Sequence, residues 1–178
     1  MREIFFHEDD YVQIQFLPDS SLEFCIEEMQ ICDEHAEKHR AAVGAGWTKM
    51  YIRKDAPQNL GVFTISASEL SAALDRHLAR YDHVFTGYST HRERCVRTLA
   101  WGDDGFVLFA EHDEDLIVRE LWFGLGQWRA EKADDYVSTL VNLPHASELL
   151  IVDWAWSRIV PLADAECLKA YVDERATV

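Results

Sequence analysis

The chain has 178 residues, of which 48 % are hydrophobic and 12 % aromatic, and its 32 acidic residues against 17 basic ones give a formal net charge of -15. This apolar content is too high for a disordered acidic chain and predicts one folded domain, spanning residues 1–178, with a sizeable core. The charge disfavours nucleic acid and anionic membranes as partners, and it favours association with a cationic protein.

The acidic residues are concentrated in blocks. Residues 1–37 contain eleven acids and one arginine, and residues 102–135 contain ten acids and three bases. Residues 38–101 differ, because five acids there are accompanied by ten bases. We therefore expect the acidic blocks to form the surface that a basic partner recognises.

The start of the chain does not have the pattern of a targeting segment. Acidic residues occupy positions where a signal peptide needs a basic head followed by an apolar run. No segment approaches the roughly 18 apolar residues that cross a bilayer. The sequence thus predicts a cytoplasmic protein without membrane contact. The four cysteines do not form a disulfide scaffold and are expected to be reduced: Cys25, Cys32, Cys95 and Cys167.

Two β-rich runs open the chain. Residues 3–7 and 11–17 flank the acidic turn at 8–10, and the second run alternates apolar and polar residues, so together they predict an N-terminal hairpin. Apolar residues then recur at spacings of three and four between residues 20 and 40, with acids between them. This pattern predicts an amphipathic helix.

The next segment is expected to return to β-structure. Runs 47–54 and 61–66 predict a second strand pair around a turn at 56–59, which contains Pro and Asn. Ser66 and Glu69 have the spacing of a capping box, which predicts that a helix begins there and continues to about Leu78.

Three β-rich runs at 95–101, 106–111 and 116–123 are separated by short turns rich in Gly and Asp. They predict an antiparallel meander, because turns this short permit only hairpin connections. The composition of residues 83–88 is compatible with a further strand.

The C-terminal part predicts a helix at 133–141, strands at 149–154 and 158–162, and a helix at 165–175 that begins at Asp164 as its N-cap. The chain lacks the strand–helix–strand alternation of parallel folds. The predicted fold class is therefore α+β, with a mostly antiparallel sheet, an N-terminal hairpin and three to four helices.

Metal binding has little support. Cys32, His35 and His39 share one face of the first predicted helix and could offer a thiolate and two imidazoles to zinc, but no second ligand pair accompanies them. The acidic turns lack the spacing and glycine of a calcium loop. We expect no metal and no cofactor.

Catalytic motifs are missing, including the phosphate-binding loops and the nucleophile elbow, so no residue is predicted to be catalytic. Arg92, Arg94 and Arg97 form the main basic concentration. We expect them to pair with the acidic blocks or to form a dimer contact. One alternative stays open: a small-ligand-binding protein or enzyme whose site is built from scattered His, Arg and Glu residues.

The preferred hypothesis is an acidic protein-binding module that inhibits or neutralises a basic protein. Immunity proteins that neutralise nuclease-type toxins have the same physical character, since they are small, acidic and without catalytic motifs; this likeness is one of type and depends on no shared motif. A homo-oligomer remains possible. The candidate partner-binding residues are the carboxylates of two turns and one helix face: Glu8, Asp9, Asp10, Glu27, Glu28, Glu34, Asp113, Glu114 and Asp115.

Overall fold

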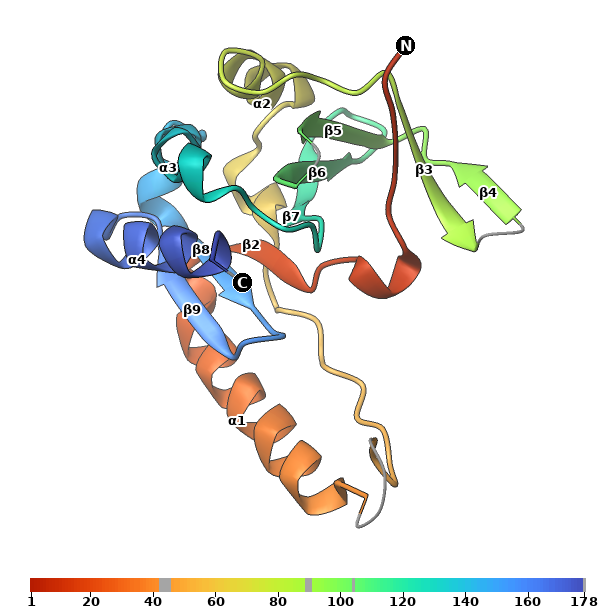
Figure 1. Cartoon of the computed structure of the whole chain (residues 1–178), viewed down its shortest axis with the longest axis vertical. Coiled ribbons are helices and arrows are strands. Elements are labelled where there is room, and N and C mark those ends of the chain that lie inside the picture. The colour runs from red at the N-terminus through yellow and green to blue at the C-terminus, as the bar shows by residue number, and fades with distance from the viewer. Residues whose placement is uncertain (42–45, 89–90, 104, 178) are drawn as a thin grey trace.

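A computed structural model describes residues 1–41, 46–88, 91–103 and 105–177 (Figure 1). Its largest element is a six-stranded sheet with the strand order β5-β6-β7-β2-β8-β9, in which all neighbouring strands are antiparallel. The strands are β2 (Ile14–Pro18), β5 (Thr98–Gly102), β6 (Val107–His112), β7 (Val118–Phe123), β8 (Leu149–Asp153) and β9 (Arg158–Pro161).

A smaller sheet contains β1 (Glu3–Phe5), β3 (His83–Tyr88) and β4 (His91–Arg94). β1 is parallel to β3, and β3 is antiparallel to β4. The two N-terminal strands expected to form a hairpin are therefore present, but they pair in different sheets. β2 has no free edge for β1, because β7 and β8 occupy both of its sides.

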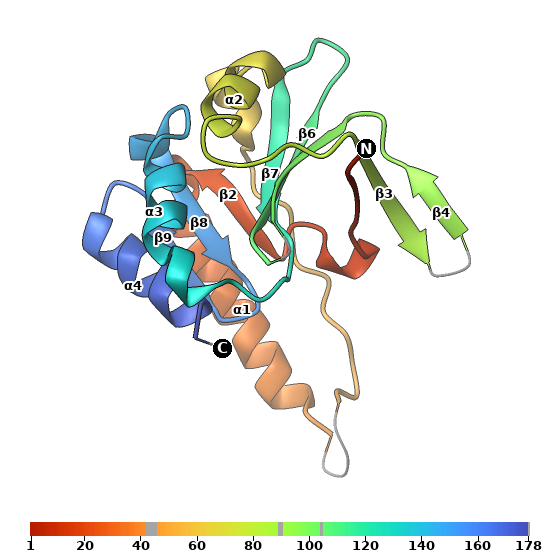
Figure 2. The same cartoon turned by 45° about the horizontal axis from the view of Figure 1, so that its top comes forward.

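Successive residues of a strand point to opposite faces of the sheet. One face, which we call the helical face, packs Ile14, Phe16 and Ile151 against three helices. Figure 2 shows two of these helices, α3 and α4, lying side by side. The helices of this face are α2 (Ala67–Leu74), α3 (Ala133–Val141) and α4 (Ala165–Arg175).

The opposite face, which we call the α1 face, is covered in two parts. Over β2 and β8, Leu17 and Val152 pack against Cys25 and Met29 of α1 (Leu22–His39). Over β5 to β7, aromatic residues such as Trp122 pack with residues of the smaller sheet and its connections. The cover is thus discontinuous near β2 and β7, in the middle of the sheet.

The α+β class, the mostly antiparallel pairing and the helix at 20–40 are confirmed, and the described residues form four α-helices. The meander is also confirmed, since β5, β6 and β7 pair consecutively. Both predicted caps form. The Ser66 side chain accepts a hydrogen bond from the backbone N of Glu69 at 3.1 Å, and Asp164 accepts one from the backbone N of Cys167 at 3.0 Å.

The second predicted strand pair, at 47–54 and 61–66, is wrong. Leu60–Phe63 forms a 3-10 helix that buries Leu60 in the core of the helical face, and Thr64 then adopts a left-handed conformation with φ 51°. Residues 51–56 have no regular secondary structure and run beside α1. Their hydrogen bonds go partly to a helix side chain, Glu28, instead of to a partner strand.

Within the described ranges, no helix combines the length and the apolar character needed to span a membrane.

Candidate functional site

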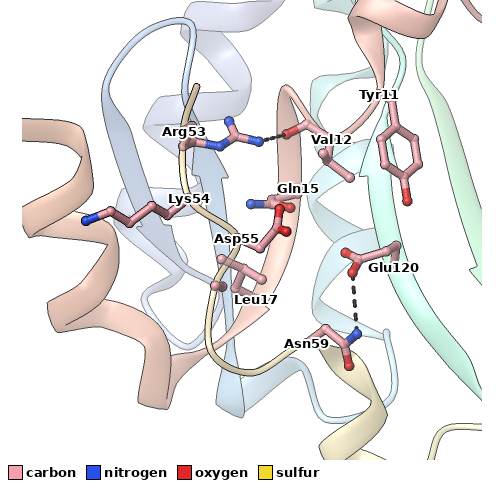
Figure 3. Close-up of a pocket in the computed structure, with 10 residues that line it drawn as sticks. Tyr11, Val12, Gln15, Leu17, Arg53, Lys54, Asp55, Asn59 and Glu120 are labelled. Atoms are coloured by element: carbon pink, nitrogen blue, oxygen red, sulfur yellow. Dashed lines mark hydrogen bonds between the residues drawn. The ribbon is translucent and has the colours of Figure 1, made fainter. Parts of the chain in front are cut away.

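A cavity of about 370 Å³ lies on the α1 face, where the cover of the sheet is interrupted (Figure 3). Its floor is formed by Gln15 and Leu17 of β2 and by Glu120 of β7. Tyr11 and the segment 53–59 form its walls. Polar side chains therefore occupy this side of the sheet, whereas the alternate positions on the helical face are apolar.

Two carboxylates face each other in the pairing of β6 with β7. Glu111 and Glu120 are direct partners in this antiparallel pair, so both side chains lie on the α1 face. The Tyr11 hydroxyl donates to Glu111 Oε2 at 3.2 Å, and Asn59 Nδ2 donates to Glu120 Oε1 at 3.5 Å. No cationic side chain in the described part of the chain forms an ion pair with Glu120.

Burial raises the pKa of Glu120 to about 7, and the neighbouring charges of Glu111 and Asp55 contribute in the same direction. Burial, followed by the charge of Glu111, also raises the pKa of Tyr11, so this phenol stays protonated and acts as a donor. The site thus holds a carboxylate that is half protonated near neutral pH beside a neutral phenol.

Arg53 borders the cavity on another side. Its guanidinium carbon lies 4.2 Å from the centre of the Trp154 ring, and its Nη2 donates to the backbone oxygen of Val12 at 3.3 Å. Burial lowers its pKa, although nearby negative groups oppose this effect. Val12 has φ 49°, which is a strained conformation for a β-branched residue. The Arg53 guanidinium is therefore held by the Trp154 ring and by the backbone carbonyl of Val12, a residue with a strained backbone conformation.

Gln15 is the most buried polar residue of the cavity, with 6 % of its surface exposed. Its backbone belongs to the pairing of β2 with β7 and β8. Its side chain lines the cavity, and it has no hydrogen-bond partner among the described residues. The described polar side-chain atoms that are fully buried without a hydrogen bond belong to other residues, so the Gln15 amide opens into the cavity, where a bound group can form hydrogen bonds with it.

The predicted partner-binding residues lie in three separate places. Glu8, Asp9 and Asp10 form a 3-10 turn between β1 and β2, and the first two are exposed. Glu27 and Glu34 are exposed on α1. The third set forms the turn between β6 and β7, beside the start of α2, so the structure does not unite the three sets into one surface.

Two of the nine carboxylates each accept several hydrogen bonds from within the chain. Glu28 is 2 % exposed and accepts hydrogen bonds from the Tyr51 hydroxyl at 2.9 Å and from the backbone N of Lys54 at 2.8 Å. Asp113 accepts from the backbone N of Ile117 and pairs with Arg119, and these contacts, with the Ile117 hydrogen bond first, lower its pKa. Neither carboxylate is free for a partner in this conformation.

Glu114 and Asp115 are exposed at the tip of the same turn. Arg97 lies 4.0 Å from Glu114, and Arg92 lies 3.6 Å from Glu3. The expectation that this basic concentration pairs with the acidic blocks is confirmed for these two arginines.

The candidate zinc ligands do not form a metal centre. The rings of His35 and His39 lie 4.3 Å apart, and His35 Nε2 is 3.3 Å from the backbone oxygen of Lys49. Among the residues that the structure describes, no group of three His, Cys, Asp or Glu side chains could hold a metal ion. All four cysteines are free thiols, and burial raises the pKa of Cys25 to about 11.

Sequence reasoning missed the cavity residues Gln15, Arg53 and Glu120. One signal was present in β7, where Glu120 lies two residues before Trp122 and thus shares its face, while a β-bulge turns Val118 to the helical face. A carboxylate in the buried phase of a strand marks a polar site.

Comparisons of the chain with protein-family models, with curated proteins and with solved structures found no match.

Proposed function

We propose that this chain is an acidic, cytoplasmic protein that binds a basic protein and inhibits or neutralises it, as toxin-immunity proteins do. The observation that carries this proposal is a projecting surface, which we call the arm. The arm consists of α1 and residues 46–52, and Figure 1 shows it extending beyond the large sheet. Exposed apolar and acidic side chains alternate on it.

The apolar part of the arm is unusually open to water. The exposed fractions are 63 % for Trp47, 90 % for Met50, 87 % for Ile52 and 53 % for Ile26. Trp and Met are enriched in the centres of protein interfaces, where their burial excludes water. Trp47 and Met50 line one surface pocket, and exposed apolar residues gathered in this way are typical of a protein-binding site.

The polar part of the arm specifies the charge of the partner. α1 carries six acids and one lysine, and five of these acids are exposed. Carboxylates around an apolar centre speed the encounter with a basic surface and disfavour acidic ones. Of the candidate partner-binding residues in α1, Glu27 and Glu34 are exposed on the arm, whereas Glu28 is buried. The two acidic turns remain secondary candidates, because they lie elsewhere on the molecule.

The test compares reversal of charge on the arm with reversal elsewhere. The variant Glu27→Lys/Glu34→Lys changes two exposed carboxylates of α1, and Glu131→Lys/Glu166→Lys changes two exposed carboxylates outside it. A candidate partner is first identified by cross-linking in a native lysate and is then purified. Its association rate is measured against ionic strength for the wild type and both variants.

The proposal predicts that the partner is basic, that the arm variant associates at least tenfold more slowly, and that the control changes much less. A partner that is not basic, or equal rates for the two variants, would contradict it. Trp47→Ser should raise the dissociation rate, because this side chain would be an interface anchor.

A second candidate is a small-ligand-binding protein, which the cavity on the α1 face favours. Arg53 and Glu120 converge on this cavity, and the pKa of Glu120 is perturbed, as expected for a binding site. None of the described histidines lines it. Arg53, Gln15 and Glu120 supply donors and acceptors for a polar ligand.

A further inference from the structure

We propose that the cavity on the α1 face binds an organic cation, a guanidinium or an ammonium group, against Glu120 and Asp55. This deepens the second candidate function and does not require a protein docked on the arm. The same chemistry is found in a free small molecule and in an Arg or Lys side chain of a partner.

The first argument is an uncompensated pair of like charges. Glu111 and Glu120 oppose each other directly across β6 and β7, an arrangement that destabilises a sheet. Glu120 is half-buried, and Asn59 is its only hydrogen-bond partner among the described residues, at the long distance of 3.5 Å. A cation bound beside Glu120 would neutralise one of the two charges and supply the missing donors.

The second argument is the unpartnered amide of Gln15. This side chain is 94 % buried, lies in the floor of the cavity, and has no hydrogen bond to any described residue. Its carbonyl oxygen can accept from an N–H group, whereas the carboxylate of Glu120 accepts from another. A guanidinium or ammonium group carries several such donors and can satisfy both acceptors together.

The walls of the cavity also suit a cation. The Tyr11 ring lines it and packs edge-on against Trp122, with the ring centres 4.9 Å apart. Aromatic faces attract cations, and Arg53 already uses Trp154 in this way. The fold therefore contains one internal example of the interaction that the ligand would make.

An anion fits the cavity less well. Arg53 and Lys54 are its cationic residues, but Arg53 is held over Trp154 and bonded to Val12, and the Lys54 ammonium points away from the cavity in Figure 3. An anion would approach Glu120 and Asp55 directly. A metal ion is also disfavoured, because the described residues contain no group of three suitable ligands.

Protons compete with the cation at Glu120. The ionisable groups around this carboxyl are Glu111 from β6, Tyr11 from the turn before β2, and Arg53, Lys54 and Asp55 from the segment beside α1. Because the pKa of Glu120 is raised to about 7, the cation must displace a proton at lower pH. Affinity should rise up to about tenfold per pH unit below pH 7 and level off above pH 8.

The experiment uses the full chain and methylguanidinium or butylammonium as probes, in 150 mM salt at about pH 8. Binding is followed by NMR at the Gln15 side-chain amide and the Trp122 indole. Glu120→Gln removes the charge, and Glu93→Gln is a matched control on an exposed strand of the smaller sheet. Gln15→Leu keeps every charge and removes the side-chain amide, so binding to this variant is followed at the Trp122 indole alone.

We expect saturable shifts at both reporter groups, a loss of at least tenfold in affinity for Glu120→Gln, a severalfold loss for Gln15→Leu, and no change for Glu93→Gln. Unsaturable shifts, equal binding by Glu120→Gln, or tighter binding of acetate than of methylguanidinium would overturn the proposal. Because Glu120→Gln relieves a like-charge pair, it should remain folded at this pH.

Two further measurements distinguish the two sources of the cation and the two proposed functions. The first compares methylguanidinium with N-acetylarginine amide, which presents the guanidinium as a protein side chain does. Tighter binding of N-acetylarginine amide assigns the site to a partner's side chain. Tighter binding of methylguanidinium assigns it to a small molecule. The arm variant Glu27→Lys/Glu34→Lys should retain cation binding, so failure of the arm proposal leaves this one intact.

Discussion

Each face of the large sheet carries a carboxylate, fully buried on the helical face and half-buried on the α1 face, and the two are surrounded differently. On the helical face, Asp153 is fully buried and accepts hydrogen bonds from the Tyr171 hydroxyl at 2.8 Å, from the backbone N of Trp156 at 3.1 Å and from the Arg175 guanidinium. On the α1 face, Glu120 has one long hydrogen bond and no ion pair with any described residue. The first carboxylate is satisfied by the fold, whereas the second is left for a ligand.

The largest expected effect is from Asp153→Ala. Arg175 and Tyr171 would lose their acceptor, and removal of one partner from a buried ion pair typically costs about 3–5 kcal/mol of unfolding free energy. Urea unfolding checks this value. Asp134→Ala is the control, because Asp134 pairs with Lys169 on an open surface, where ion pairs contribute little. Equal midpoints for the two variants would contradict the contrast between buried and exposed pairs.

The Glu120→Gln variant should become more stable than the wild type as pH rises. Burial raises the pKa of Glu120 from 4.5 to about 7, so the folded wild type binds more protons than the unfolded chain between these values and loses stability as they are removed. The difference in unfolding free energy should be near zero at pH 4 and on the order of 3 kcal/mol at pH 9.

Measuring the difference between the two proteins at each pH removes the contributions of groups that both share. A difference that is independent of pH would show that Glu120 ionises equally in the folded and unfolded chain. This result would contradict the account, in which the fold neutralises the charge of Asp153 but not that of Glu120.

Glu28→Ala should destabilise by about 2 kcal/mol, because a charged acceptor of two hydrogen bonds is lost. Glu27→Ala, one residue earlier on the exposed face, should change stability little. Amide hydrogen exchange should also speed up at Lys54 in the Glu28 variant alone. If both variants behave alike, Glu28 is not the residue that fastens the 51–54 segment to α1.

The smallest effect concerns the helix that supplies Tyr171 and Arg175 to Asp153. Asp164→Ala removes the N-cap of α4 and should cost about 1 kcal/mol, whereas Asp164→Asn keeps an acceptor and should cost less. Thermal unfolding of the two variants tests this. An equal loss in both would indicate that the charge of Asp164, and not the capping hydrogen bond, stabilises the helix.

Local signals predicted much of the fold. Ser66 and Asp164 cap helices where their spacing indicated, and short turns fixed the β5-β6-β7 meander. The parallel pairing of β1 with β3 could not be predicted, because it joins residues about 80 positions apart and depends on both edges of β2 being occupied. Long-range pairing carries no local sequence signal.

The candidate site was less accessible to sequence reasoning. Gln15 alternates with Ile14 and Phe16, a pattern that indicates a solvent-facing side chain, yet residues of the 53–59 segment cover it. Glu28 could have been recognised, because it falls on the apolar stripe of α1 between Cys25 and Cys32. The sequence shows the charge of each carboxylate but not its burial. Burial decides whether a carboxylate forms hydrogen bonds within the fold or is available to a partner.

The central claim is that the α1 face holds a half-buried carboxylate whose charge no other group of the fold neutralises. The most direct test is a pH titration of the Glu120 side-chain carbon by NMR in the wild type, assigned by its absence in Glu120→Gln. The structure predicts a midpoint at about pH 7 that falls when methylguanidinium is added. A midpoint near the ordinary value of 4.5, unchanged by the cation, would contradict the claim.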